Sequence, residues 1–263
     1  MRILGICTRL QLAQLRSAMA YRGDFWIALV GAVLQQFVGL TFLITFFGQV
    51  PKLGSWTMPE VLMLHGLVTA ILGMGEMFTD GVWRLRIDVN EGSFDRVLVR
   101  PLPPVLQQMT QIASIHGTGN LAVGLAAFGY GIAHSSVAWH WWTLPVILLA
   151  FACGCVLNAC INLLSNCIAF WEPSATSSFP TMVGVMRDFA KFPLDIYGVV
   201  VKTIATFAVP FAAITYWPVC LVLQRPGAHG WWALTPVLAA GATLALASLV
   251  WRRGLAAYQG VGH

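Results

Sequence analysis

The sequence contains few charged residues. Aspartate, glutamate, lysine and arginine make up 10% of its 263 residues, whereas apolar residues make up 58%. Ordinary soluble domains have about 25% charged and about 45–50% apolar residues, so this composition excludes a domain surrounded by water. A hydrocarbon core about 30 Å thick requires roughly 20 apolar residues for each helical crossing, and several runs in this chain reach that length. We therefore predict an integral membrane protein.

Motifs for catalysis and nucleotide binding are also missing. The chain has no Gly-x-Ser-x-Gly elbow, no His-Glu-x-x-His metal pair and no phosphate-binding Gly-x-x-x-x-Gly-Lys loop. The segment from Asp80 to Asp95 faintly resembles the metal-binding signature of phospholipid head-group transferases, but the leading and trailing aspartates of that signature are absent. We therefore expect no catalytic residue, no metal site and no cofactor in this chain. Any ATP with its Mg²⁺ has to be bound by another subunit.

The positive charges lie mainly in three places. Two thirds of the lysines and arginines precede the first apolar run, follow the second or follow the last: Arg2, Arg9, Arg16, Arg22, Arg84, Arg86, Arg96, Arg100, Arg252 and Arg253. An even number of crossings puts these groups on one side of the membrane, and the positive-inside rule assigns that side to the cytoplasm. The net charge of +5 thus indicates topology and not binding of nucleic acid. Both termini are expected in the cytoplasm.

Residues 1–22 do not resemble a secretory signal peptide. Four arginines interleave with leucines there, and no continuous apolar core precedes a cleavage site. Arg2, Arg9 and Arg16 are spaced to share one side of a helix, while most of the apolar residues fall on another. We predict an amphipathic helix in the cytoplasmic interface of the membrane. A frayed basic tail is the alternative.

Long apolar runs predict transmembrane helices over most of the chain. Hydropathy assigns five of them, to residues 26–47, 60–78, 105–133, 142–170 and 231–251. Cytoplasmic termini require one further crossing between these last two spans. That crossing is either 196–222, the more apolar choice, or 174–192 followed by a re-entrant pair of short helices over 193–222. Irregular backbone at membrane depth has to be buried in protein, which constrains the second alternative.

The loop over residues 84–102 is strongly polar and lies between the second and third spans. Within it, the acid-Gly-Ser start at Glu91 is followed by a cluster of Phe94, Val97 and Leu98, and by Arg100 and a proline. This pattern is typical of a short helix that proline ends. Such a helix presents an apolar face in the cytoplasm, either to the bilayer surface or to another protein.

This loop resembles that of the type-2 ABC transporter permeases, in the ABC-2 branch with a Phe-Asp-x-x-Leu-x-Arg-Pro-Leu pattern. Further short motifs resemble that branch in the same order, at residues 21–26, 170–171, 192–197, 210–212 and 216–218. The resemblance covers almost the full length. None of these motifs is long or catalytic. The resemblance therefore depends on the whole set of motifs occurring in this order.

The resemblance implies an all-α membrane protein with six transmembrane helices and an interfacial helix at the N-terminus. It also implies a cytoplasmic coupling helix after span 2 and a re-entrant helical pair before the last span. It therefore favours 174–192 as the fifth span and 193–222 as the re-entrant pair. ABC ATPase subunits and a second permease, identical or related, are the implied partners besides membrane lipids. The implied location is the bacterial inner membrane.

The coupling loop is the implied ATPase contact. The apolar face from Phe94 to Leu98 is expected to fill a groove on the ATPase, with charged residues around it. The residues expected to make this contact are Glu91, Gly92, Phe94, Asp95, Arg96, Leu98, Arg100 and Pro101.

A stripe of amides lies in the fourth span. Asn158, Asn162 and Asn166 are four residues apart and share one helical face. An amide in hydrocarbon needs a hydrogen-bond partner, so this face has to meet protein or water. The stripe either bonds to neighbouring helices or lines a translocation path. Gln35 and Gln36 in the first span have the same two interpretations.

The expected function is that of the permease subunit of an ATP-driven exporter of an amphipathic or lipid-like substrate. A membrane enzyme of lipid metabolism is one alternative, but it would need acids or histidines that converge at one depth. A secondary transporter is another, but the two halves of the chain show no internal repeat.

Overall fold

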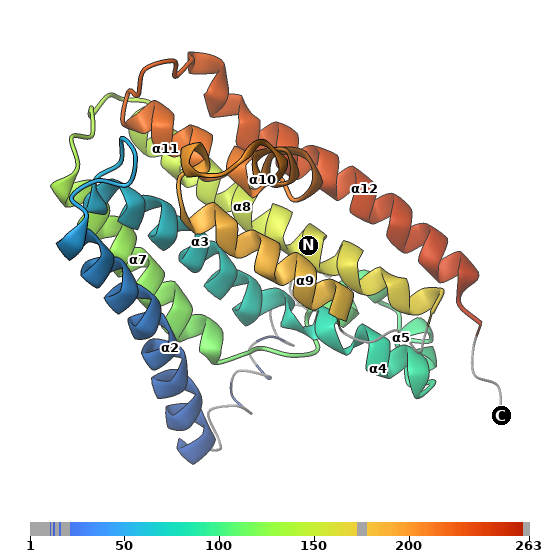
Figure 1. The fold of residues 1–263 in the computed structure, drawn as a ribbon. Coiled ribbons are helices and arrows are strands. Elements are labelled where there is room, and N and C mark those ends of the chain that lie inside the picture. Colours follow the sequence, from blue (N-terminus) through green and yellow to red (C-terminus); the bar gives the residue numbers. More distant parts are fainter. Residues whose placement is uncertain (1–10, 12, 14–15, 17–21, 173–177, 260–263) are drawn as a thin grey trace.

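The computed structural model describes residues 11, 13, 16, 22–172 and 178–259, and within this part the chain forms helices and turns without a strand. The interfacial helix predicted over 1–22 therefore lies almost entirely outside the described residues. Figure 1 shows long helices side by side, with α2 at one edge and α12 at the other. The long helices are α2 (Arg22–Gln49), α3 (Met58–Thr79), α7 (His116–His134), α8 (Thr143–Asn166) and α12 (Thr235–Ala257).

Four helices are long and apolar enough to cross a membrane, at Gly23–Gln49, Met58–Asn90, Thr143–Phe170 and Gly230–Ala257. A bent pair, Val199–Ala208 with Phe211–Val222, raises the number to five if it counts as one span. Helix α7 has 19 residues, but its glycines and polar side chains lower its mean hydropathy. The fold is thus helical with several membrane spans, and the number of six stays a prediction.

Helices α3 and α7 pack backbone against backbone. A Cβ atom added at Gly66 or Gly73 of α3 would collide with the backbone of α7, and one at Gly124 would collide with the backbone of α3. Small residues permit this approach in lipid, where packing replaces the hydrophobic effect as the driving force between helices. The glycines that lower the hydropathy of α7 therefore hold it against α3.

The third span is shorter than predicted. Residues 105–133 are expected as one helix, but α6 (Pro104–Met109) ends well before α7 begins at His116. The intervening turn bonds to α3, since the backbone nitrogen of Ser114 donates to the carbonyl of Glu76 at 3.1 Å. Between α3 and α6 lie the short elements η1 (Asp80–Arg84), α4 (Leu85–Asn90) and α5 (Asp95–Leu98). We call this group, residues 80–109, the cap.

The segment after α8 is broken into short elements. Helix α9 has 11 residues, about 17 Å at 1.5 Å per residue, which is less than a bilayer core requires. Residues 174–177, at the start of the predicted fifth span, lie outside the described part. A straight helix over 196–222 is not found, because the chain bends by 78° within it. The elements are η2 (Cys167–Phe170), α9 (Ser178–Asp188), η3 (Phe189–Lys191), η4 (Leu194–Ile196), α10 (Val199–Thr203), η5 (Ile204–Ala208), η6 (Phe211–Ala213), α11 (Tyr216–Val222) and η7 (Gly230–Leu234).

The two ends of the bundle differ. Figure 1 shows the cap beside the C-terminal end of α12, and the connections from α2 to α3, α7 to α8 and α11 to α12 at the opposite end. Helix α2 exposes many apolar side chains along its length, which suits contact with lipid or with another membrane chain. These side chains include Trp26, Ile27, Val30, Leu34, Phe37, Val38 and Phe42.

Candidate functional site

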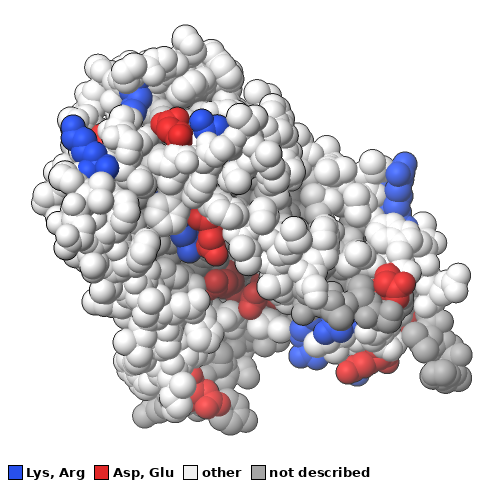
Figure 2. Space-filling model, in the orientation of Figure 1, with Lys and Arg blue, Asp and Glu red and all other residues white. Residues whose placement is uncertain are grey.

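A polar cavity of about 580 Å³ opens between α2, α3, α7, α8 and α9. Figure 2 shows acidic and basic side chains together in a hollow of this face, between α2 and α9. Charged groups at membrane depth usually face a bundle interior or a water-filled space. The polar residues around the cavity are Gln35, Gln36, Thr69, Glu76, Asp80, Ser114, His116, Asn120, Asn158, Asn162, Thr181, Arg187, Asp188 and Lys191.

Arg187 forms the basic part of the cavity. Its Nη1 atom donates to Oδ1 of Asn158 at 2.7 Å and to Oδ1 of Asn162 at 2.9 Å. These two asparagines are successive members of the stripe predicted on α8. The third member, Asn166, is buried and donates to the carbonyl of Asn162 at 2.9 Å, away from the cavity. Asn158 and Asn162 thus bond to the neighbouring helix α9 and line the cavity, whereas Asn166 bonds within its own helix.

Glu76 forms the acidic part of the cavity. Its Oε2 atom accepts from Nδ2 of Asn120 at 2.7 Å, and Oδ1 of Asn120 accepts from Nε2 of Gln36 at 2.9 Å. This chain of hydrogen bonds joins α3, α7 and α2, and it fixes which way both amides point. Gln35 lines the same cavity. Both glutamines predicted for a pathway are thus placed at this cavity.

The charges of the cavity are only partly paired. Lys191 Nζ lies 2.8 Å from Asp188 Oδ1. Neither Glu76 nor Arg187 makes an ion pair with any residue of the described part. Asp80 lies one turn beyond Glu76 and also lines the cavity. In the described ranges, no group of three or more His, Cys, Asp or Glu side chains is placed to hold a metal ion.

The sequence pattern reveals only part of this cavity. The amides on α8 and α2 stand out as polar residues in apolar runs. Arg187 and Asn158 are 29 positions apart, so nothing local in the sequence pairs them. Asn120 is hidden among the glycines of α7, although a lone amide in a helix of small residues is the signal that could have found it.

The cap is anchored by Phe94, whose side chain is fully buried. Its ring packs edge-on against Phe170 at 5.4 Å, Trp251 at 6.2 Å and Tyr258 at 5.1 Å between ring centres. The expectation that Phe94 fills a groove on a partner is therefore wrong. The apolar face of this short helix is used inside the chain, because the ends of α8 and α12 supply an aromatic site for it.

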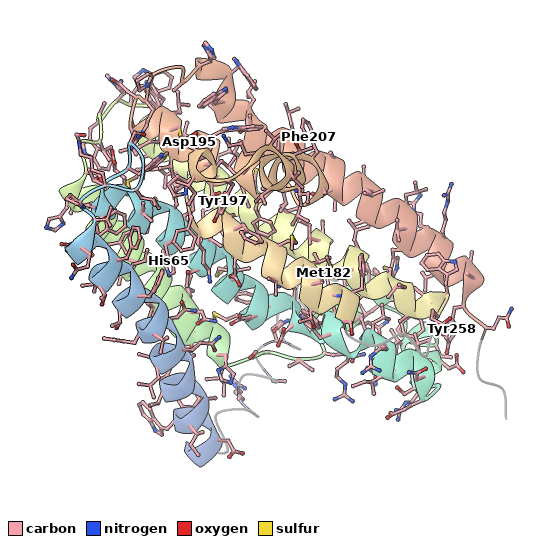
Figure 3. The ribbon with its side chains drawn as sticks, in the orientation of Figure 1. His65, Met182, Asp195, Tyr197, Phe207 and Tyr258 are labelled. Carbon is pink, nitrogen blue, oxygen red and sulfur yellow. The ribbon has the colours of Figure 1, made fainter. Side chains whose placement is uncertain are left out.

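Tyr258 ties the end of the chain to the cap. Figure 3 shows it where α12 ends near α5, and its hydroxyl donates to Oδ1 of Asp95 at 3.0 Å. Burial and the neighbouring carboxylate raise the pKa of Tyr258 to about 12, so the hydroxyl keeps its proton at neutral pH. The cap is therefore joined to the C-terminal end of α12 by this hydrogen bond as well as by the packing of Phe94.

The exposed surface of the cap carries the remaining residues predicted for the ATPase contact. Glu91, Asp95, Arg96, Leu98, Arg100 and Pro101 are all exposed. Gly92 has a φ of 68°, which favours glycine at this turn. Val99, which the sequence pattern does not single out, is 83% exposed. Leu98 and Val99, together with Ile87 of α4, are the exposed large apolar side chains of the cap.

The cap is held together internally. Buried Asp88 accepts from Ser93 Oγ at 3.0 Å and from Gln108 Nε2 at 3.0 Å. Gln108 Nε2 also donates to the carbonyl of Gly81 at 3.1 Å, and Gln107 Nε2 donates to that of Val97 at 3.0 Å. These bonds join η1, α4, α5 and α6 into one hydrogen-bonded unit.

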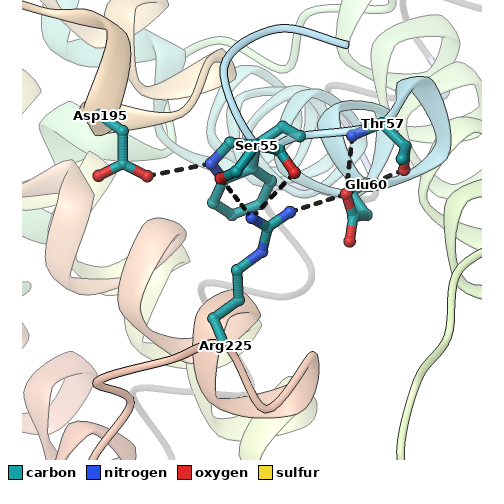
Figure 4. Close-up of polar contacts among 6 residues, drawn as sticks. Ser55, Thr57, Glu60, Asp195 and Arg225 are labelled. Atoms are coloured by element: carbon teal, nitrogen blue, oxygen red, sulfur yellow. Dashed lines mark hydrogen bonds and ion pairs between the residues drawn. The ribbon is translucent and has the colours of Figure 1, made fainter. Parts of the chain in front are cut away.

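At the opposite end of the bundle, Arg225 connects α11 to the turn before α3 (Figure 4). Its guanidinium contacts Ser55 Oγ at 2.7 Å and Glu60 Oε2 at 2.7 Å. The Nε1 atom of Trp56 donates to Oδ2 of Asp195 at 3.0 Å. We call these five residues, with Thr57, the outer clasp.

His65 is buried where α3 faces α2 (Figure 3). Neither of its ring nitrogens has a hydrogen-bond partner in the part of the chain that the structure describes. It does not line the polar cavity.

The chain is similar to a known protein family. A family model described as "ABC-2 family transporter protein" matches residues 33–262. The matched range contains all the residues that line the cavity, as well as the cap and the outer clasp. No curated protein and no solved structure matched the chain.

Proposed function

The chain belongs to the ABC-2 family of transporter membrane proteins, and from this premise we propose that it is the membrane-spanning subunit of an ATP-driven exporter. Its role as a multi-pass permease follows from the family and from its apolar helices. We further propose that transport is outward, that the ATPase contacts the cap and that the substrate passes through the polar cavity. ATP and Mg²⁺ bind to a separate ATPase subunit, because this sequence has no phosphate-binding loop.

The cap is the surface on which the ATPase docks. It joins exposed Leu98 and Val99 to exposed Arg96 and Arg100, which suits a contact with an apolar centre and a charged rim. The cap is internally bonded and is packed on Trp251. Movement of the ATPase therefore reaches α3, α8 and α12 together, as expected for rigid-body switching.

The polar cavity is part of the transport path. It combines charges and amides that are costly to bury, and such groups in membrane helices mark functional sites. The cavity lies beside α2, whose exposed apolar side chains suit a second permease, identical or related. An amphipathic cargo fits a polar cavity that borders such an apolar helix. The complex lies in the bacterial inner membrane, with both termini of this chain in the cytoplasm.

The family match over 33–262 carries this proposal, and purification from the native membrane tests it. The tagged chain is extracted in mild detergent, and ATP hydrolysis by the preparation is measured with and without vanadate. We expect an ATP-binding subunit in the preparation and vanadate-sensitive hydrolysis that requires Mg²⁺. A well-folded preparation that lacks both would contradict the proposal, and phospholipid turnover by the chain alone would favour the membrane enzyme.

A further inference from the structure

Arg187 and Glu76 are two of the charged residues that line the polar cavity, and they form no ion pair with each other. Arg187 is held by the amide oxygens of Asn158 and Asn162, and Glu76 is held by the amide of Asn120. Amides fix the direction of a charged group but supply no counter-charge. Both charges therefore face one space with their charge uncompensated by any ion pair among the described residues.

Charged side chains without an ion-pair partner cost free energy while the cavity is empty. Taking a charge out of water costs free energy that only an opposite charge or good solvation returns. The Nε atom of Arg187 is buried and has no hydrogen-bond partner in the described ranges. Lys191 Nζ pairs with Asp188 Oδ1 at 2.8 Å and forms no ion pair with Glu76. The site is thus prepared for a molecule that brings one charge of each sign.

We propose that the cavity binds the head group of a zwitterionic amphiphile, with its oxyanion at Arg187 and its ammonium at Glu76. This inference rests on the proposed function, because it names the cargo class of the same cavity. Guanidinium groups suit phosphate and carboxylate oxyanions through several parallel N–H donors. Asp80, one turn from Glu76, adds a second carboxylate on the ammonium side.

The size and borders of the cavity suit such a head group. A volume of about 580 Å³ lies within the usual range of about 300–1,000 Å³ for small-molecule sites. Val185 of α9 lines the cavity and is 52% exposed, and Met182 on the same helix is 61% exposed (Figure 3). An acyl chain can therefore leave the cavity along α9 while the head group stays among the polar residues.

Retention of lipids by the purified complex tests this inference. The permease with its ATPase is exchanged into a non-ionic detergent and mixed with phosphatidylethanolamine or phosphatidylglycerol that carry identical acyl chains. Native mass spectrometry then measures how much of each lipid is retained. We expect at least tenfold tighter retention of phosphatidylethanolamine, because phosphatidylglycerol has the oxyanion and lacks the ammonium.

Two variants identify the residues that recognise the head group. Glu76→Gln is isosteric and should abolish the preference while retaining phosphatidylglycerol as the wild type does. Arg187→Gln should weaken retention of both lipids. Asp24→Asn, at an exposed position of α2, and Arg252→Gln, at an exposed position of α12, are the control variants and should retain both lipids as the wild type does. If Arg187→Gln fails to fold, the Glu76→Gln result decides.

Soluble phosphoethanolamine distinguishes the two sources of the head group. If phosphoethanolamine competes with the lipid, the site recognises the head group whether or not acyl chains are attached. If the wild type prefers phosphatidylethanolamine but phosphoethanolamine does not compete, the occupant is a membrane lipid. Equal retention of the two lipids by the wild type, or an unchanged preference in Glu76→Gln, would overturn the inference. Either result leaves the proposed function standing if the ATPase subunit is still present in the preparation.

Discussion

The guanidinium carbon of Arg225 lies 3.8 Å from the ring centre of Trp56, and its Nη2 atom lies 2.7 Å from Glu60 Oε2. Both charged side chains are mostly buried, with 15% and 13% of their side chains exposed. Glu60 also accepts from the backbone nitrogen of Thr57 at 2.7 Å. One carboxylate thus begins α3 and holds α11 against it.

Replacing Arg225 should open this outer clasp. Arg225→Gln removes the ion pair and the cation–π contact and leaves Glu60 partly buried without its counter-charge. We expect a loss of about 2–4 kcal/mol in the free energy of unfolding, seen as a lower unfolding temperature in detergent. Arg225→Lys should lose less, because the charge remains. Arg252→Gln, at an exposed position of α12, is the control, and an equal effect of both glutamine variants would contradict the role of the clasp.

The contact between α3 and α7 predicts a sharp difference between two glycines. A Cβ at Gly73 would collide with the backbone of Leu121, whereas a Cβ at Gly129 meets nothing within 4 Å. Gly73→Ala should therefore force the helices apart and cost about 1–3 kcal/mol. Gly129→Ala should be neutral or slightly stabilising, because alanine favours the helix. Thermal unfolding of the two purified variants compares them directly, and equal unfolding temperatures would exclude the close packing.

Phe94 and Tyr258 separate packing from hydrogen bonding in the cap. Phe94→Ala leaves a cavity among three aromatic rings and should cost about 3–5 kcal/mol. Tyr258→Phe keeps the ring and loses only the bond to Asp95, so it should cost about 1 kcal/mol. Limited proteolysis within residues 84–102 reports how firmly the cap is held. Faster cleavage of Phe94→Ala than of Tyr258→Phe is expected, and the reverse order would refute this account of the anchor.

The sequence predicts the surroundings of a residue best where the chemistry of its own side chain determines them. Amides in apolar runs have to find partners, so the chemistry of the amide alone predicts that Asn158, Asn162 and Gln36 face protein or water and not lipid. The membrane-spanning character of the chain follows from its composition, because a chain with so few charged residues cannot form a surface that faces water. These features depend on local chemistry alone.

The errors concern contacts between distant segments. Phe94 looks the same in sequence whether its ring meets a partner or its own chain, and the choice depends on Trp251, more than 150 residues later. The predicted third span is too long because hydropathy does not register the turn that bonds to Glu76. The sequence marks Arg187 only as a charge in a weakly apolar segment, since its partners lie on another helix.

The most direct test of the proposed coupling is the amount of ATPase subunit that stays bound to the permease when the cap surface changes. Val99→Asp introduces a charge at the exposed apolar centre of the cap, and Val50→Asp introduces the same charge at an exposed position after α2, at the opposite end of the bundle. Both variants are purified from native membranes at matched yield, and the ATPase subunit is quantified. We expect at least a tenfold loss of bound ATPase subunit for Val99→Asp and no loss for Val50→Asp. Full retention by Val99→Asp, or equal loss in both variants, would contradict the proposed coupling.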